Sequence, residues 1–316
     1  MRHFLLAALV ATSLAMGLAA CGSSSSDNGS GGGSGVSGAV AVDGSSTVFP
    51  FAQAAAEGFQ GENSGAKVTV GESGTGGGFE KFCAGETDIS DASRPIDAKK
   101  EVPVCEKAGI TYAEILIAND GIAIVSNPGL KVSCLKVDQL KALWNSTSTV
   151  KDYADLGAGI PSGKVSLYGP GTDSGTFDFF TETINGTKGD TRKDYQPSED
   201  DNVLVQGVSG DSSGLGYFGF SYYEGNKDKL NLVAVDGGKG CVKPSIAAVQ
   251  DGSYTPLSRP LFMYVSNKAL SSKPQVKGFI DYVVANAKTA AETAQIVPLT
   301  AEQLDKSKAE LAKAQA

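Results

Sequence analysis

Gly44-Ser45-Ser46-Thr47 leads directly into Val48, Phe51, Ala55 and Phe59, which recur at helical spacing. This order predicts a helix whose first turn is preceded by small, hydroxyl-bearing residues. Such a helix end carries unpaired backbone N–H groups and about half a positive charge. Because glycine allows a close approach and serine or threonine adds an O–H donor, the stretch is suited to bind a small oxyanion.

The same pattern occurs twice more, each time as a Gly, Ser and Thr cluster followed by apolar residues at helical spacing. The two further clusters are Gly74-Thr75-Gly76-Gly77-Gly78, followed by Phe79, Phe82 and Cys83, and Thr172-Asp173-Ser174-Gly175-Thr176, followed by Phe177, Phe180 and Ile184. Three such helix ends that converge on one point would form a socket for an anion. The pattern therefore favours binding over catalysis.

Short apolar runs alternate with helical stretches through the rest of the chain. The predicted strands cover residues 39–42, 67–70, 113–118, 122–126, 165–168, 215–220, 230–235 and 261–265, and residues 87–95 are predicted to be a short strand that ends in a turn. Further helices are predicted over 137–144, 274–287 and 301–314, whereas periodicity does not decide between helix and strand for 202–208. This alternation predicts an α/β fold with parallel-rich sheets.

The first residues have the features of an export signal. Arg2 is followed by an apolar run over 4–18, and Leu18-Ala19-Ala20-Cys21 resembles a bacterial lipoprotein cleavage box. Residues 1–20 are therefore predicted to be a lipoprotein signal peptide and Cys21 the lipidation site. The alternative is an ordinary signal peptide with a cysteine there by chance.

Residues 21–38 consist almost entirely of Ser and Gly, a composition typical of a flexible tether. No later stretch is long and apolar enough to cross a bilayer. Together these features predict an extracytoplasmic protein held by lipid to a membrane, either in the periplasm or on the outer face of the cell membrane.

Composition excludes several classes of function. The whole chain has a formal net charge of −8, which argues against a nucleic-acid partner. Its single histidine is His3, inside the predicted leader. This position argues against Ser-His-Asp or Cys-His catalysis and against His-ligated metals. We therefore expect no enzymatic activity, no cofactor and no metal.

Four cysteines follow the leader, namely Cys83, Cys105, Cys134 and Cys241. An even number in an exported chain predicts two disulfides, for which three connectivities are possible. We favour Cys83–Cys105, which closes a short local loop, together with Cys134–Cys241. Metal binding is the alternative, but no C-x-x-C spacing supports it.

Two motifs resemble those of other protein classes. Asp173-Ser174-Gly175-Thr176 is similar to an aspartic-protease motif, but that chemistry needs two carboxylates sharing a proton, and Asp43-Gly44-Ser45 has the wrong order. Residues 214–219 match G-x-G-x-x-G, yet they lie inside a predicted strand rather than between a strand and a helix. Close backbone packing is the interpretation we favour for these glycines.

Arg94 is the one basic residue embedded in a loop of small polar residues, Asp91-Ala92-Ser93-Arg94-Pro95. A planar guanidinium can bind a tetrahedral oxyanion with two hydrogen bonds, which makes Arg94 the predicted basic ligand. The alternative is a surface arginine. Arg192 lies in a polar run typical of a solvated segment, and Arg259 is expected to brace a connection between lobes.

Taken together, these stretches resemble the phosphate-binding lipoproteins of bacterial ABC importers, a PstS-like family of periplasmic binding proteins. The resemblance covers nearly all of residues 39–300 and rests on residues 43–50, 71–79, 88–95, 169–176 and 214–220. It implies a two-lobed, type II Venus-flytrap fold with chain crossings near Asp120 and Pro260. Lobe one would comprise residues 39–119 and 262–316, and lobe two residues 120–261.

The resemblance also implies a set of phosphate ligands. Lobe one would contribute Ser46, Thr47, the N–H of Val48, Thr75, Gly76 and Ser93, and lobe two Ser174, Gly175 and Thr176. The best-known members of the family carry an Asp where Ser93 stands and, a few residues before the Ser-Gly-Thr, an Arg where Pro170 stands. Arg94 would then replace the guanidinium, and Asp173 or Asp91 the carboxylate that accepts the phosphate proton.

The function implied is a monomeric, membrane-tethered receptor that binds inorganic phosphate between its lobes. It would deliver the phosphate to the permease subunits of an ABC transporter in the cytoplasmic membrane. Three alternatives are the same fold with another oxyanion such as sulfate or molybdate, a secreted hydrolase that uses Ser174, and a surface adhesion or signalling module without transport.

Overall fold

The computed structural model describes residues 35–172, 174–198 and 200–316. The predicted signal peptide, Cys21, most of the predicted tether and Asp173 lie outside the described residues. Within the described part, no helix is both long and apolar enough to cross a membrane.

Strands and helices alternate along the chain, as the sequence predicts. The strands are β1 (Gly38–Gly44), β2 (Ala66–Gly71), β3 (Ile89–Ala92), β4 (Tyr112–Ser126), β5 (Cys134–Lys136), β6 (Ser166–Pro170), β7 (Gln196–Ser198), β8 (Gly214–Gly219), β9 (Asn231–Asp236), β10 (Cys241–Val242) and β11 (Ser258–Ser266). The α-helices are α1 (Phe49–Glu62), α2 (Gly74–Cys83), α3 (Val102–Lys107), α4 (Val137–Trp144), α5 (Gly175–Phe180), α6 (Asp201–Gly210), α7 (Phe220–Glu224), α8 (Ile246–Gln250), α9 (Asn267–Ser272), α10 (Pro274–Ala285), α11 (Ala287–Thr293) and α12 (Ala301–Ala314). A 3₁₀ helix η1 (Tyr153–Leu156) and a π-helical turn η2 (Thr181–Asn185) complete the set described.

The strands form a continuous mixed sheet in the order β2-β1-β3-β11-β4-β8-β6-β7, with β9 also paired to β4. Parallel pairs join β1 to β2 and β3, and β6 to β7 and β8. The two long strands β4 and β11 run antiparallel to each other. A further parallel pair joins β5 to β9, whereas the pairs made by β4 and β11 are antiparallel. The α/β class is therefore confirmed, and the parallel pairing that the alternation predicts occurs away from the two long strands.

Strand β4 differs from the sequence-based expectation. Two separate strands were expected on either side of Asn119-Asp120-Gly121, because such residues are typical of turns. In the structure, these three residues continue the strand and pair with Pro260, Arg259 and Ser258 of β11. Pairing with a distant strand thus overrides the local turn preference.

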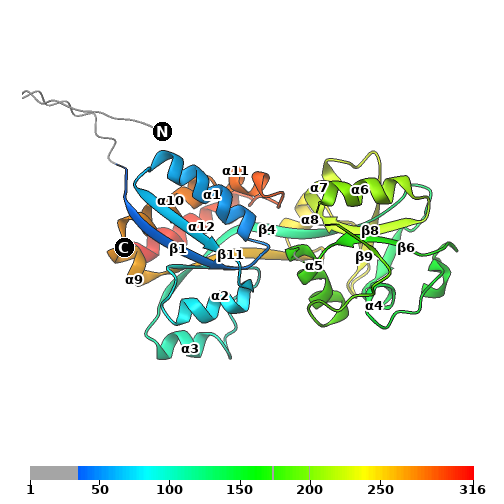
Figure 1. Cartoon of the computed structure of the whole chain (residues 1–316), viewed down its shortest axis with the longest axis horizontal. Helices are drawn as coiled ribbons and strands as arrows, with labels where there is room; N and C mark the ends of the chain where they lie inside the picture. The colour runs from blue at the N-terminus through cyan, green and yellow to red at the C-terminus, as the bar shows by residue number, and fades with distance from the viewer. Residues whose placement is uncertain (1–34, 173, 199) are drawn as a thin grey trace, which may run out of the picture. The chain divides into compact units, whose positions relative to one another are not determined.

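Buried hydrophobic residues gather into two large cores. The terminal core draws its residues from 40–118 and 261–311, and includes the apolar face of α1. The central core draws its residues from 122–257, with Val297 in addition. Strands β4 and β11 pass between the two groups of elements that surround these cores (Figure 1).

Several helix predictions can be compared directly with the structure. Helices α4 and α12 have the bounds predicted, and residues 201–210 form α6 rather than a strand. The single helix expected over 274–287 is divided at Asn286, whose side-chain amide donates back to the Tyr282 carbonyl at 3.0 Å. Asparagine often ends helices because its side chain competes for backbone groups in this way.

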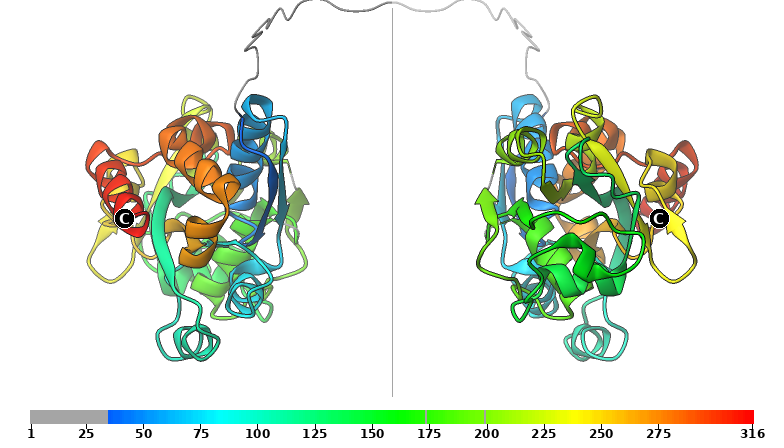
Figure 2. Two further views of the ribbon diagram at one scale, coloured as in Figure 1. Left: turned by 90° about the vertical axis from the view of Figure 1, so that its left-hand side faces the viewer. Right: turned by 90° about the vertical axis from the view of Figure 1, so that its right-hand side faces the viewer.

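The structure pairs Cys83 with Cys105 and Cys134 with Cys241, which confirms the favoured connectivity. Helix α3 has only six residues, and Cys105 is the one that is buried. Figure 2 shows α3 standing out from the neighbouring elements. The disulfide joins this short helix to the end of α2, within a smaller buried cluster that also contains Phe79 and Phe82.

The G-x-G-x-x-G stretch lies within β8 as expected. A Cβ added at Gly216 would lie 2.5 Å from the Tyr168 carbonyl oxygen and 2.9 Å from Val208 Cγ2. These glycines therefore allow close packing of β8 against β6 and α6, in agreement with the interpretation favoured from the sequence.

Candidate functional site

The first Gly, Ser and Thr cluster forms a turn at the start of α1. The Ser45 amide donates to the Asp91 carbonyl at 3.0 Å, and the Val48 amide donates to the Ser45 carbonyl at 3.1 Å. The Val48 side chain is fully buried, so this residue is turned into the terminal core. Ser46 and Thr47 are left at the outer side of the turn, where they line a cavity.

The second cluster begins α2. Ser73 precedes the helix, but its hydroxyl and its amide both donate to the Asp43 carboxylate and leave the first turn of α2 without a side-chain cap. Lys81 pairs with the same carboxylate. Burial opposes ionisation of Asp43, but the hydrogen bonds from Lys81 and Ser73 lower its pKa below the ordinary value. The uncapped start of α2, which includes Thr75 and Gly76, faces the cavity.

Thr75 is joined to Ser93 from the loop after β3. Their hydroxyl oxygens lie 3.0 Å apart, and the Ser93 amide donates to Thr75 Oγ1 at 3.2 Å. Because a hydroxyl both donates and accepts, this pair can donate a hydrogen bond to an anion while staying bonded internally. The second cluster and the Ser93 loop are therefore brought to one place, as the resemblance implies.

The third cluster caps α5 and reaches the first cluster. Ser174 Oγ accepts hydrogen bonds from the amides of Thr176 and Phe177 at 3.2 and 3.4 Å. Gly175 lies so close to Thr47 that an added Cβ would stand 2.6 Å from Thr47 Oγ1 and 2.9 Å from Thr47 Cα. Residues about 130 positions apart in the chain are thus in contact, and only glycine fits there.

Two cavities lie beside this contact and share Ser46, Thr47 and Gly175. The larger has a volume of about 500 Å³ and the smaller about 360 Å³. Among the predicted ligands, Thr75, Gly76, Ser93 and Arg94 line the larger cavity, whereas Ser174 and Thr176 line the smaller one. Val48 lines neither cavity, and Asp173 lies outside the described residues.

The charged residues of the two cavities differ. The larger cavity is lined by Arg94, Lys188 and Arg259 together with Asp178 and Glu182. The smaller cavity is lined by Glu72, Asp120 and Asp201, and no basic residue joins them among the described residues. An anion would therefore be attracted to the larger cavity and repelled from the smaller one.

Arg259 holds a central place in the larger cavity, although the sequence suggested only a bracing role. Its Nε donates to Asp120 Oδ2 at 3.1 Å, and its Nη2 donates to Thr47 Oγ1 at 2.7 Å. Its guanidinium carbon lies 3.6 Å from the ring centre of Phe179. Burial lowers the pKa of Arg259 and Asp120 raises it, but the group stays charged because guanidinium is so strongly basic.

Arg94 lines the same cavity, but its guanidinium is already engaged. Nη1 and Nη2 donate to the two carboxylate oxygens of Glu101 at 2.8 and 2.7 Å. This hydrogen bonding raises the pKa of Arg94, and the side chain is 45% exposed. Because Glu101 accepts hydrogen bonds from both Nη atoms, Arg94 is less available to bind an anion than the sequence suggested.

Asp91, one of two carboxylates considered for the phosphate proton, lines neither cavity. It is fully buried on β3, and neither of its carboxylate oxygens has a hydrogen-bond partner among the described residues. Burial, with a smaller effect from the charge of Asp43, raises its pKa well above the ordinary value. The carboxylates that do line the larger cavity are Asp178, which pairs with Lys188 at 2.6 Å, and Glu182.

Asp91→Asn is expected to reduce the pH dependence of the free energy of unfolding. Above about pH 4, where an aspartate in the unfolded chain loses its proton, the folded protein retains the Asp91 proton, so stability falls as pH rises. An amide cannot ionise, so the variant should gain stability relative to the parent as pH increases from 4 to 8. Urea unfolding across this range measures the effect, and parallel pH profiles for the two proteins would contradict it.

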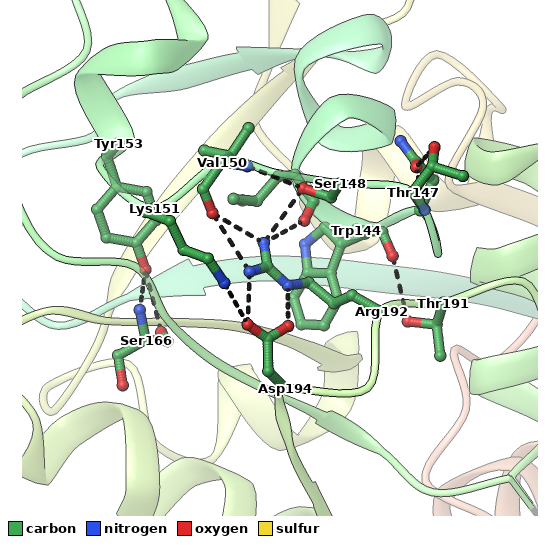
Figure 3. Close-up of polar contacts among 12 residues, drawn as sticks. Trp144, Thr147, Ser148, Val150, Lys151, Tyr153, Ser166, Thr191, Arg192 and Asp194 are labelled. Carbon is green, nitrogen blue, oxygen red and sulfur yellow. Dashed lines mark hydrogen bonds and ion pairs between the residues drawn. The ribbon is translucent and has the colours of Figure 1, made fainter.

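Arg192 is not the solvated residue that its polar neighbours suggest. Its side chain is only 4% exposed, and its guanidinium donates to the carbonyls of Leu143 and Val150 (Figure 3). Asp194 accepts from its Nε and Nη2 at 2.6 and 2.9 Å. With its donors occupied by protein acceptors, Arg192 holds together the segments around Trp144 and is not free to bind an anion.

The structure adds residues to the larger cavity that the sequence analysis does not place there. They are Ser45, Ser73, Gly74, Asp178, Phe179, Glu182, Thr183, Lys188 and Arg259. Three of them lie on one helical face, because they come three, four and seven residues after Gly175: Asp178, Phe179 and Glu182. That spacing could have identified them from the sequence, whereas nothing local to Arg259 points to its role.

Comparison with known proteins identifies the family of the chain. The model of the PBP superfamily domain matches residues 29–287. The chain belongs to this superfamily. The solved structure of a possible phosphate binding protein from Planctomyces limnophilus superposes with a TM-score of 0.84 at 41% identity. The alignment covers 89% of this chain and 100% of that one.

Two named relatives are similar over most of their length. Protein SphX from Synechococcus elongatus is 46% identical over 266 residues, which cover 83% of this chain and 78% of SphX. The phosphate-binding protein PstS from Staphylococcus saprophyticus is 41% identical over 265 residues, which cover 83% of this chain and 81% of PstS. These matches confirm the family and the type of fold that the sequence predicts.

Proposed function

We propose that the chain is an extracytoplasmic receptor that binds inorganic phosphate in the larger cavity and delivers it to an ABC permease. One observation carries the proposal: the guanidinium of Arg259, whose side chain is only 14% exposed, lines this cavity with an unused N–H donor. Arg259 uses Nε and Nη2 on Asp120 and Thr47, whereas its Nη1 has no acceptor among the described residues. A largely desolvated cation with an unused donor can hold a second anionic partner beside Asp120.

Several neutral donors surround the same space. Hydroxyl groups come from Ser46, Thr75 and Ser93, and the start of α2 contributes the positive end of its dipole. Hydrogen bonds to an ionised acceptor are about twice as strong as neutral ones, so this donor set favours a compact oxyanion. The related PstS is named a phosphate-binding protein, which selects phosphate among such anions.

Binding would stabilise a closed arrangement of two lobes. We place lobe one at residues 39–119 and 262–316 and lobe two at 120–261, with Thr47 of the first meeting Gly175 of the second. An anion held by donors from both lobes favours the closed form by the difference in its affinity for the two forms. Ser174 and Thr176, next to the contact, would reach the anion only through a further adjustment of α5.

Attachment and transport complete the proposal. The lipoprotein-like leader supports lipidation at Cys21, and the Ser/Gly-rich residues 21–38 would tether the binding domain to the membrane. A monomer on such a tether can release its phosphate to permease subunits in the cytoplasmic membrane. Binding and release need no covalent chemistry, which agrees with the absence of histidine beyond the leader.

Isothermal titration of the purified protein with phosphate and, separately, with sulfate tests this function. The expected result is one phosphate bound per chain with a clear heat, and affinity for sulfate lower by about five- to 150-fold, as one unpaired polar group costs about 1–3 kcal/mol. Bound phosphate should first be removed by mild unfolding and dialysis. Absence of binding heat with phosphate at several temperatures would contradict the proposal.

A further inference from the structure

The segment between α11 and α12 passes from one core to the other. Ile296 packs against the terminal core, whereas its neighbour Val297 is 3% exposed and belongs to the central core. Leu304 and Leu311 of α12 then return to the terminal core. The chain therefore runs between the two cores at this segment as well as along β4 and β11. We call residues 295–303 the third tie.

Backbone and side-chain hydrogen bonds fix the third tie on both sides. Asn119 of β4 and Val297 exchange two backbone hydrogen bonds, of 2.8 and 2.9 Å. On the other side, Gln250 at the end of α8 donates its side-chain amide to the Pro298 carbonyl at 2.8 Å. The third tie thus lies between a strand shared by both cores and a helix that packs on the central core.

Gln303 closes this network from the first turn of α12. Its side-chain nitrogen donates to the Gln250 carbonyl at 3.1 Å and to Asn119 Oδ1 at 3.3 Å. Its side-chain oxygen accepts from Asn119 Nδ2 at 3.1 Å and from the Thr300 amide at 3.0 Å. One amide therefore joins α12, β4 and α8, and a double amide pair with Asn119 fixes that residue in one orientation.

Asn119 links the third tie to the anion site. The next residue, Asp120, holds Arg259 at 3.1 Å, and Arg259 donates to Thr47 at 2.7 Å. Both backbone groups and the side chain of Asn119 are bonded to the third tie, so the position of Asp120 depends on it. Gln250 and Gln303 line neither cavity, which means that any effect they have on binding must pass through other residues.

We propose that the third tie positions the Asp120–Arg259 pair for the anion and limits the separation of the two cores. Gln250 and Gln303 are its positioning residues. The identity of the anion rests on the proposed function, whereas the mechanical connection does not. Loosening the third tie should let Asp120 shift, which weakens the hold of Arg259 on the bound anion and speeds its release.

The test compares Gln250→Ala/Gln303→Ala with the control Gln275→Ala/Gln315→Ala in the full chain. Each control glutamine also loses an amide hydrogen bond, to the Ala39 carbonyl or to Asp281, but away from the third tie. The dissociation constant for inorganic phosphate should rise about three- to tenfold in the test variant, as expected for coupled neighbours, and stay within about twofold in the control. Circular dichroism and thermal unfolding confirm that both variants are folded at the assay temperature.

Repeating both titrations in an Arg259→Lys background separates positioning from general destabilisation. Lysine at position 259 keeps the positive charge but lacks the planar guanidinium with its fixed donors. The orientation of the side chain relative to Asp120 then matters less for anion binding. The effect of the test variant should then fall below about twofold. An equal effect in both backgrounds, or no effect in either, would overturn the proposal.

Amide hydrogen exchange tests the mechanical connection in the absence of phosphate. Exchange at Asn119 and Val297 should be at least about tenfold faster in the test variant than in the control, because local opening follows the loss of supporting contacts. Unchanged exchange would overturn the mechanical connection. If exchange rises as expected but the parent binds no phosphate, the proposed function fails while the third tie stands.

Discussion

Arg259→Gln is expected to raise the dissociation constant for phosphate by at least about 30-fold, or about 2 kcal/mol. The substitution removes the buried charge that faces the larger cavity and the donor that reaches Thr47 at 2.7 Å. It also leaves the Asp120 carboxylate without its cation, a like charge close to the bound anion. Calorimetric titration of parent and variant measures the effect.

Arg94→Gln is the matched control for this prediction. Arg94 lines the same cavity, but both of its Nη atoms already donate to the Glu101 carboxylate. Its loss should therefore raise the dissociation constant by less than about fivefold, which is the size of effect expected for a solvent-exposed ion pair. The double variant Arg259→Gln/Asp120→Asn guards against unfolding caused by an unpaired buried carboxylate. A larger loss from Arg94→Gln than from Arg259→Gln would show that the basic ligand has been assigned to the wrong residue.

Gly175→Ala is expected to weaken phosphate binding by about five- to 150-fold, because overpacking costs about 1–3 kcal/mol. The new methyl group would lie 2.6 Å from Thr47 Oγ1 and 2.7 Å from the Thr47 nitrogen, closer than real Cβ atoms approach. The backbone nitrogen cannot rotate away, so the two clusters must move apart. Titration with phosphate detects the loss of the contact that closes the site.

Gly76→Ala provides the control on the same cavity. A Cβ added at Gly76 meets nothing within 4 Å, and neither glycine has a positive φ. Both substitutions introduce alanine into the first turn of a helix, where it is well tolerated. Phosphate affinity should change by less than about threefold in Gly76→Ala, as expected for surface changes. Equal losses in the two variants would mean that the Thr47–Gly175 contact has no special part in binding.

The helix starts could be predicted because their signals are local. Each Gly, Ser and Thr cluster lies next to its own apolar face, so α1, α2 and α5 follow from residues a few positions apart. The disulfide pairing could also be predicted. Cys83 and Cys105 are close in sequence and close a short loop, and once they are paired the remaining two cysteines can pair only with each other. Local patterns do not show that Thr47 and Gly175 come close together. That expectation came from the family resemblance, which places both residues at the ligand.

Arg259 and the Asn119-Asp120-Gly121 stretch show where local patterns fail. The ion pair between Arg259 and Asp120 joins residues 139 positions apart, and the sequence around either one gives no sign of it. Likewise, turn-forming residues continue a strand only because β11 supplies the pairing. Both depend on how β4 and β11 lie side by side, which is a property of the whole fold.

A crystal structure of the protein with bound phosphate tests the central claim most directly. The account predicts phosphate in the larger cavity, within hydrogen-bond distance of the Arg259 guanidinium, Thr47 and at least one hydroxyl of the Thr75–Ser93 pair. Phosphate held by Arg94 without Arg259, or bound outside the cavity that Thr47 and Gly175 adjoin, would contradict it.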